Sequence, residues 1–176
     1  MFRKLVNDEL GRLSVSEFKT IEKAPVVVVL DNVRSQHNIG SAFRSSDAFK
    51  VEKIYLCGIC AVPPSAQIHK SALGAEFSMD WEYCKNTIEV VEKLRSEGYT
   101  IVSVEQAENS TSLELFHCEE GSHYAFIFGN EVHGVAQEVV DASDLCLEIP
   151  QYGTKHSLNV SVSIGIVLWE IFSPCA

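Results

Sequence analysis

The sequence predicts an α/β fold with a mainly parallel sheet and helices on both of its faces. Three observations support this fold class. Short apolar runs alternate with longer amphipathic segments, one apolar run is continuous and β-branched, and no repeat or linker divides the chain. A chain of 176 residues with 46% hydrophobic residues can bury one full core. We expect a polar, partly helical leader over residues 1–24 and a single domain over residues 25–176.

The first half of the chain contains four predicted elements after the leader. Val26–Leu30 is a continuous apolar, mostly β-branched run, which is typical of a strand buried on both faces. Ile39–Phe49 fits the helix that follows this strand, and Lys53–Cys57 has the length and apolar content of a second strand. Two prolines end that region, and Ser65–Leu73 is predicted as a short helix.

The second half continues the alternation of strands and helices. Phe77–Trp81 is predicted as a weak strand, and Thr87–Glu97 as an amphipathic helix that a glycine ends. The later strands are predicted at Thr100–Val104, Tyr124–Phe128 and Leu145–Ile149.

The C-terminal segment Ser157–Phe172 is predicted as the last helix. Its helical spacing predicts a buried stripe of apolar side chains, namely Leu158, Val162, Ile166 and Trp169. Its first turn carries the polar side chains of Ser157, Asn159 and Ser161. Such groups suit a helix cap and also suit contact with a ligand.

The charge of the chain restricts the classes of partner. A net charge of −10 argues against broad, nonspecific nucleic-acid binding, which needs many Lys and Arg side chains at phosphates. Residues 1–23 hold five basic and four acidic side chains, a net charge of +1, which leaves −11 on the remainder. Any nucleic-acid surface must therefore be confined, although symmetric pairing of two copies would enlarge it.

The chain also lacks the sequence features of a secreted or membrane protein. No apolar run approaches the length of a membrane helix, and polar residues follow Arg3 and Lys4 where a signal peptide needs an apolar run. We therefore expect a cytoplasmic protein. Four cysteines lie in or beside apolar segments, as reduced core thiols do: Cys57, Cys60, Cys118 and Cys146. The Cys57–Cys60 pair has no second pair at zinc-ribbon spacing, so we expect no metal site.

Three polar clusters follow apolar strands. They are Asp31–Gly40, which runs on to Arg44, then Gly129–Gly134, and finally Pro150–Ser157. In open parallel sheets, ligands bind at the carboxyl ends of the strands. We therefore expect the three clusters to converge on one pocket.

These segments together resemble the SpoU/TrmH family of RNA ribose 2′-O-methyltransferases, within the SPOUT superfamily. The resemblance covers residues 26–172 and rests on three motifs in order. They are Asn-x-Gly-x-x-x-Arg at Asn38, Gly40 and Arg44, Gly-Asn-Glu-x-x-Gly at Gly129 to Gly134, and Pro150 followed by Ser157 to Ser161. Each motif alone is weak, whereas the ordered set is specific. Ser163 departs from the pattern, because the family commonly has Ala there.

The resemblance implies a fold, a cofactor and a partner that alternation alone does not predict. It implies a deep trefoil knot at the C-terminus, with S-adenosyl-L-methionine held in that knot largely by backbone groups. The implied cofactor contacts are Gly129, Ile149, Leu158 and, less securely placed, Val104. It also implies a homodimer. Trp169, Ile166 and Phe172 would supply an apolar surface for pairing, or would equally form ordinary core.

The resemblance also assigns catalytic candidates. Arg44 would grip the phosphate of the target and lower the pKa of its hydroxyl, or would itself remove the proton. Without the motif, Arg44 would pair with Asp47 on the helix surface. Asn38 would cap the helix and orient Arg44, Glu131 would bond loop amides or Arg44, and Ser157 and Asn159 would contact the ribose or fix Arg44. A histidine flanks each motif, and each is either a catalytic base or an ordinary loop residue: His37, His133 and His156.

Three functions remain open at this level. The first is methyl transfer to structured RNA, with transfer RNA preferred to ribosomal RNA. That preference rests on the short leader and on Ser71–Glu76, which resembles a segment of guanosine-modifying members. The second is a catalytically silent, cofactor-binding dimer that binds RNA or assists assembly, which the acidic balance favours. The third is an ordinary doubly wound nucleotide-binding protein, which would need a glycine-rich turn after the first strand, and none is present.

Overall fold

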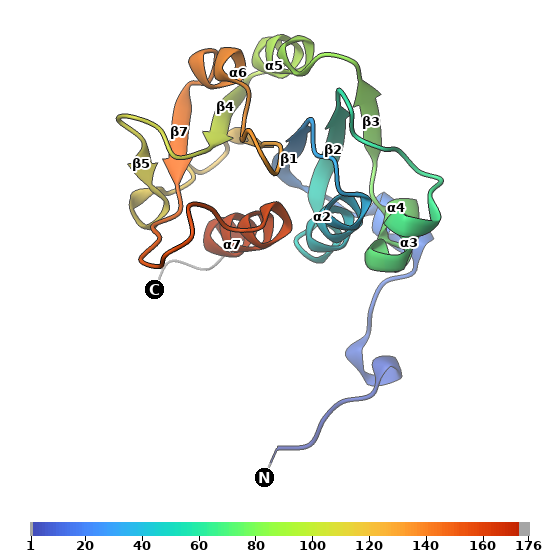
Figure 1. The fold of residues 1–176 in the computed structure, drawn as a ribbon. Helices are drawn as coiled ribbons and strands as arrows, with labels where there is room; N and C mark the ends of the chain where they lie inside the picture. The colour runs from blue at the N-terminus through green and yellow to red at the C-terminus, as the bar shows by residue number, and fades with distance from the viewer. Residues whose placement is uncertain (1, 173–176) are drawn as a thin grey trace.

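The computed structural model describes residues 2–172 and is built around a seven-stranded sheet (Figure 1). The strand order is β3-β2-β1-β6-β4-β7-β5, and every strand pair within the described residues is parallel. The strands are β1 (Ala24–Asp31), β2 (Val51–Cys57), β3 (Trp81–Cys84), β4 (Tyr99–Val104), β5 (Thr111–Ser112), β6 (His123–Phe128) and β7 (Leu145–Glu148).

The helices form two layers over this sheet. The α-helices are α1 (Val15–Thr20), α2 (Gln36–Ala48), α3 (Ala66–Ala72), α4 (Ala75–Ser78), α5 (Thr87–Ser96), α6 (Gln137–Asp141) and α7 (Val160–Phe172), and the 3₁₀ turns are η1 (Asn7–Leu10) and η2 (Leu113–Leu115). Figure 1 shows α7, α2, α3 and α4 on one face and α5 and α6 on the other. The mainly parallel α/β fold is therefore confirmed.

The central strand explains why both faces are covered. Val27, Val28 and Val29 of β1 are at most 1% exposed, and β1 pairs with β2 on one side and β6 on the other. Alternate β1 side chains enter two separate clusters, with Val28 and Leu30 in the core under α2 and α7, and Val27 and Val29 in the core under α5 and α6. Because successive side chains of a strand point to opposite faces, a continuous apolar run is buried on both faces of the sheet.

The expected strand at Phe77–Trp81 is wrong. Phe77 lies in the short helix α4, where Ser78 Oγ donates to the Ala75 carbonyl at 3.1 Å and to Asp47 Oδ1 at 2.6 Å. The strand β3 begins only at Trp81, because pairing with β2 begins there, opposite Ile54. Five residues of local pattern carry no information about that partner strand.

The last helix also differs from the prediction. It begins at Val160, since Asn159 Oδ1 accepts a hydrogen bond from Ser161 N at 2.9 Å, so residues 157–159 precede the helix. Its buried side chains are Val160, Ile164, Val167 and Leu168. The predicted stripe is wrong for Leu158, Val162 and Trp169, which are 37%, 49% and 64% exposed, whereas Ile166 is partly buried against the core.

The burial of the cysteines agrees only in part with the prediction. Cys57 and Cys60 are buried as expected, whereas Cys118 is exposed.

The leader contains η1 and α1. Phe18 of α1 is buried against the domain, whereas the residues before α1 extend away from it (Figure 1). Residues 173–176 of the predicted domain lie outside the described residues. No helix among residues 2–172 combines the length and apolar character needed to cross a membrane.

The first motif contains a structural glycine at the contact of α2 with α3. An added Cβ at Gly40 would lie 2.1 Å from Ser71 Oγ and 2.3 Å from the Ile68 carbonyl oxygen. The carbonyl belongs to the backbone of α3 and cannot rotate away. This close approach holds α3 against the helix that carries Arg44.

We therefore expect Gly40→Ala to lower the free energy of unfolding by about 1–3 kcal/mol, because α3 must shift to admit the methyl group. Urea unfolding measures the change. Gly153→Ala is the matched control, since a Cβ there meets nothing within 4 Å. Equal stability of the two variants would contradict the assigned contact.

Candidate active site

A cavity of about 550 Å³ lies beyond the carboxyl ends of β4, β6 and β7. Two of the three polar clusters, Gly129–Gly134 and Pro150–Ser157, contribute residues to its wall. All four residues predicted to hold a cofactor line it: Val104, Gly129, Ile149 and Leu158. The catalytic candidates Glu131, Ser157 and Asn159 also line it, whereas Asn38 and Arg44 do not. The volume suits a small organic ligand.

The second cluster forms a tight backbone loop around the cavity. Asn130 N and Gly134 O, and Gly134 N and Asn130 O, are each 2.9 Å apart. A Cβ added to Gly129 would lie 2.0 Å from both Gly134 C and Val135 N. Gly134 has φ +68°, a backbone conformation that side chains disfavour. Glycine at these two positions thus lets the backbone itself form this part of the wall.

Glu131 connects this loop to the first cluster. Its Oε2 accepts from Arg34 N at 2.9 Å, and its Oε1 accepts from Ser35 N and from Asn38 Nδ2, each at 2.9 Å. Burial raises the pKa of the Glu131 carboxyl, but these hydrogen bonds outweigh burial and hold that pKa below its usual range. Glu131 is therefore a carboxylate that orders the start of α2.

Asn38 extends this connection to the third cluster. Its Oδ1 accepts from Asn159 Nδ2 at 3.2 Å, while its Nδ2 donates to Glu131. The expected capping role of Asn38 is wrong, because the N-cap of α2 is Ser35, whose Oγ accepts from Asn38 N at 3.3 Å. The side chain of Asn38 is thereby available to bridge Glu131 and Asn159, and the three motifs meet at this bridge.

Arg44 lies on α2 six residues after Asn38 and is exposed. Within residues 2–172 its side chain makes no hydrogen bond or ion pair. The alternative pairing with Asp47 is not formed, since Asp47 accepts from Ser78 Oγ instead. The guanidinium is therefore available to an external anion.

Sequence reasoning missed residues that shape the cavity. Glu105 Oε2 accepts from Val135 N at 2.9 Å, and Gln106 Nε2 donates to the His156 carbonyl oxygen at 2.6 Å. Both residues follow β4 at its carboxyl end, the position used to identify the other clusters. They hold the second and third clusters in place around the cavity.

Asp31, at the end of β1, belongs to the first predicted cluster, but its structural role was not predicted. It is 1% exposed and accepts from Ala136 N at 2.8 Å and from Thr87 Oγ1 at 2.5 Å. The buried carboxylate thereby ties the starts of α5 and α6 to the sheet. Of the histidines, His133 and His156 line the cavity and His37 lies on α2. No group of three His, Cys, Asp or Glu residues in positions 2–172 has the geometry of a metal site.

Comparison with known proteins identifies relatives of this fold and sequence. The model of the SpoU rRNA Methylase family matches residues 25–169. The 23S rRNA (guanosine-2′-O-)-methyltransferase of Neisseria meningitidis is 28% identical over 152 residues, which cover 86% of this chain and 60% of that protein. The tRNA (guanosine(18)-2′-O)-methyltransferase of Aquifex aeolicus is 31% identical over 148 residues, which cover 82% of this chain and 67% of that protein.

Solved structures agree with these relatives. The AdoMet-bound rRNA methyltransferase of Sinorhizobium meliloti superposes with a TM-score of 0.78 at 26% identity, over 87% of this chain and 58% of that one. The chain spans about 60% of the length of the curated relatives that it matches.

The hydrogen bonds to Glu131 predict an effect on stability that depends on pH. Glu131→Gln removes one acceptor oxygen and should lower the free energy of unfolding at pH 7 by about 1–2 kcal/mol. Because the pKa of Glu131 is lowered by folding, its carboxylate stabilises the fold above the unfolded pKa of about 4.3. That contribution is lost as the pH falls through the lower folded pKa.

Urea unfolding at pH 7 and pH 3 measures this difference. Glu138→Gln is the control, since that exposed side chain makes no hydrogen bond within residues 2–172. The wild type and Glu131→Gln should differ at pH 7, and the difference should shrink as the pH falls below the unfolded pKa of about 4.3. A difference of equal size at both pH values would show that the carboxylate is not responsible.

Proposed function

Because the chain belongs to the SpoU rRNA methylase family, we propose that it transfers a methyl group from S-adenosylmethionine to a ribose 2′-hydroxyl of a structured RNA. One observation carries the proposal: the bridge from Glu131 through Asn38 to Asn159, which joins all three motifs beside the cavity. Arg44 lies on the same helix as Asn38 and has no side-chain partner among residues 2–172.

The cavity fits the proposed cofactor. Its volume of about 550 Å³ and its backbone-lined wall at Gly129 suit a ligand held by main-chain groups. Val104, Ile149 and Leu158 add apolar surface, and the relative from Sinorhizobium meliloti is described with AdoMet bound. When bound, S-adenosylmethionine supplies an electrophilic methyl group on a positively charged sulfur. Such a methyl group needs no Lewis acid.

The residues of the chain would then orient the ribose and assist loss of its proton. An arginine keeps its proton to about pH 12, so we assign Arg44 to a phosphate of the target, where its charge lowers the pKa of the hydroxyl. Ser157 and Asn159 line the cavity and offer a hydroxyl and an amide to the ribose. Holding the hydroxyl in line with the methyl group supplies a large part of the rate.

The choice between RNA classes is a separate proposal. We propose a transfer RNA guanosine as the first substrate to test and ribosomal RNA as the alternative. Relatives of both kinds match the chain. Ser71–Glu76, the segment behind the transfer-RNA prediction, connects α3 with α4 beside the helix of Arg44.

We also propose the trefoil knot and the dimer that the resemblance implies. Three features support them: β7 lies between β4 and β5, α7 returns to pack on α2, and Trp169 and Val162 of α7 are largely exposed. An experimental map traced through residues 104–172 tests the threading. Sedimentation tests the pairing, and a fully active monomer of 19.5 kDa would rule out a site shared between subunits.

The proposed activity predicts cofactor binding followed by turnover. Calorimetry in chelator should detect binding of S-adenosylmethionine, and labelled cofactor should transfer its methyl group to a ribose in transfer RNA or ribosomal RNA. Gly129→Val should abolish binding, because the added side chain would overlap Gly134 and Val135. Binding with no transfer to total RNA would instead support a catalytically silent binding protein. An absolute need for added divalent ion would contradict the account.

Arg44 substitutions test the catalytic assignment. Arg44→Ala should leave cofactor binding nearly intact, since Arg44 does not line the cavity, and should slow transfer by about two to four decades. Arg44→Lys keeps the charge but loses the planar fork, so we expect it to remain close to Ala. Single-turnover assays on the same RNA measure both. Near-wild-type transfer by Arg44→Ala would show that another residue is central.

A further inference from the structure

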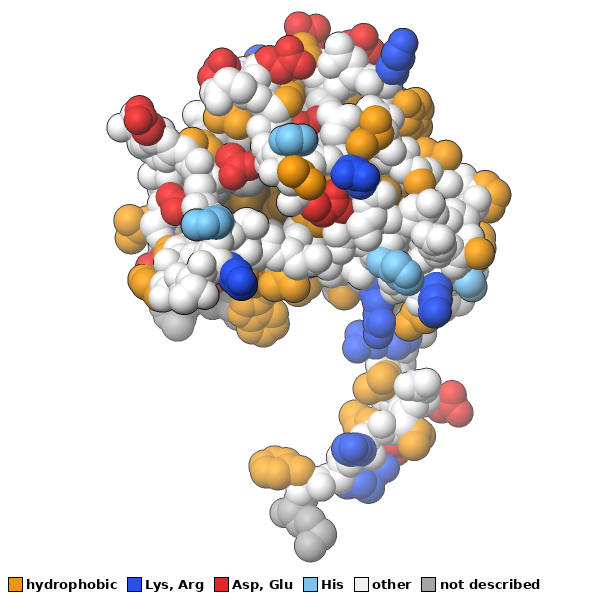
Figure 2. Space-filling view, in the orientation of Figure 1, with side chains coloured by type: hydrophobic (Ala, Val, Ile, Leu, Met, Phe, Trp, Pro, Cys, Tyr) orange, Lys and Arg blue, Asp and Glu red, His pale blue; other side chains and the backbone are white. Residues whose placement is uncertain are grey.

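The acidic side chains are distributed unequally between the two faces of the sheet. Residues 32–46, 53–75 and 149–169 contain no Asp or Glu, although the chain has 24. These segments form α3, most of α2 and α7, and the loops that precede them, and the acidic residues at the ends of α2 and α7 are Asp47 and Glu170. Helices α5 and α6, on the opposite face, carry several acidic residues, and Figure 2 shows red side chains gathered over them. A polyanion therefore meets least repulsion at the α2, α3 and α7 face.

A second cavity, of about 570 Å³, opens beside α3 on this face. Its lining is mostly apolar and aromatic: Pro63, Pro64, Ser65, Ala66, His69, Glu76, Phe77 and Trp81. It shares no lining residue with the candidate active site. Phe77 is 59% exposed, so its ring is accessible to a ligand in this cavity. We call this cavity the α3–α4 hollow.

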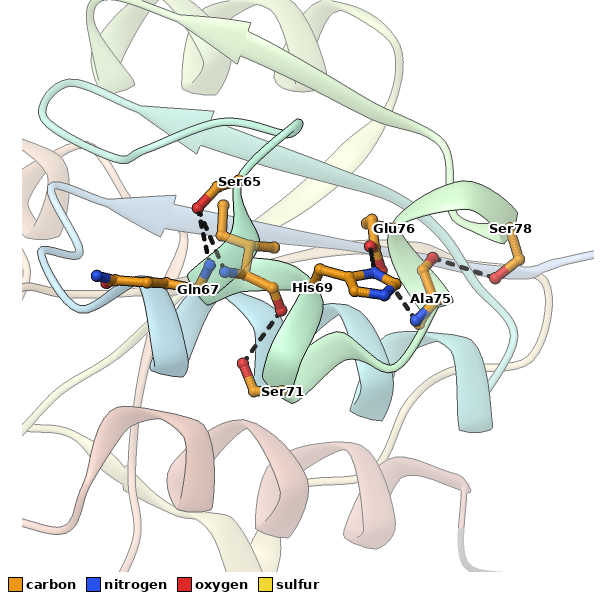
Figure 3. A network of polar contacts seen from close by, with 9 residues as sticks. Ser65, Gln67, His69, Ser71, Ala75, Glu76 and Ser78 are labelled. Atoms are coloured by element: carbon orange, nitrogen blue, oxygen red, sulfur yellow. Dashed lines mark hydrogen bonds and ion pairs between the residues drawn. The ribbon is translucent and has the colours of Figure 1, made fainter.

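A buried carboxylate fixes one wall of the hollow. Glu76 is 6% exposed, its Oε2 accepts from Gly74 N at 3.1 Å, and its Oε1 contacts Nδ1 of His69. Figure 3 shows the His69 ring directed from α3 towards Glu76 on α4. The His69 ring lies 5.9 Å from the Phe77 ring, tilted by 53°. The one acidic group in the lining is thus buried and paired, and it positions an aromatic wall.

We propose that the α3–α4 hollow seats an unpaired nucleobase of the substrate RNA, distinct from the nucleotide that is methylated, with the exposed Lys70 on α3 contacting the adjoining phosphate. A nucleobase has the flat apolar faces that stack on aromatic side chains, and RNA is read largely through unpaired bases. Residues 53–75, which include Lys70, contain no Asp or Glu, so a polyanion meets little repulsion along α3, and the aromatic lining of the hollow favours a nucleobase over an acidic protein segment. The identity of the partner rests on the proposed function, whereas the site rests on the hollow itself.

Binding measurements separate this site from the methyl-transfer cavity. The probe is a fluorescein-labelled transfer RNA transcript, with a 23S rRNA fragment as a second arm, and fluorescence anisotropy gives affinity without turnover. Phe77→Ala should weaken binding by about 5- to 100-fold through lost stacking. Phe77→Tyr should retain affinity, and Lys70→Gln should weaken it and reduce its salt dependence. Leu115→Ala is the control, because Leu115 is 74% exposed at the distant η2.

The outcomes distinguish the two proposals. Weakened RNA binding by Phe77→Ala with unchanged calorimetry for S-adenosylmethionine supports the nucleobase site, even if no RNA is methylated. Unchanged affinity for both RNAs would overturn it. A shift in sedimentation without a change in RNA affinity would also overturn it, and would assign the hollow to a second copy of the chain. Thermal unfolding of each variant, together with the Phe77→Tyr result, excludes loss of the fold as the cause.

Discussion

The carboxylate of Glu131 is the contact on which the candidate site depends. It lies after β6, yet it binds two backbone N–H groups that precede α2 and the amide of Asn38 within α2. Hydrogen bonds to a charged acceptor are stronger than neutral ones, and these span two adjacent strands. Without them the backbone N–H groups of Arg34 and Ser35 would lose this acceptor, and the start of α2 would depend on the Ser35 cap and on the contact of Asn38 with Asn159. The position of Arg44 and the bridge to Asn159 both follow from this contact.

Close backbone approach is the second constraint. Gly40 admits α3 to α2, and Gly129 admits the Gly134 segment to the wall of the cavity. These motif glycines, whose sequence pattern suggests a binding role, therefore act first through packing. A binding role and a packing role are compatible at Gly129, since it lines the cavity and also admits the Gly134 segment. At Gly40 the contact is with α3 alone, so its role is to position the catalytic helix.

The distribution of charge explains how an acidic chain can serve RNA. A net charge of −10 concerns the whole molecule, but the negative side chains lie largely outside α2, α3 and the loop before α7. The proposed methyl-transfer cavity, Arg44 and the α3–α4 hollow all adjoin this acid-free surface. Such segregation gives local attraction and long-range orientation without general affinity for polyanions. Because the acidic side chains are segregated, the net negative charge is a weaker argument for a catalytically silent protein.

The sequence by itself determined the α/β class, the buried central strand and several of the residues that line the cavity, because each depends on local apolar pattern or motif. Tertiary structure decided where α7 begins and which of its faces is buried, that Phe77 belongs to a helix, and that Asn38 bridges Glu131 and Asn159 rather than capping α2. Each of these depends on a partner distant in sequence. Local periodicity describes one segment at a time, whereas burial and hydrogen bonding are decided by which segments the sheet brings together.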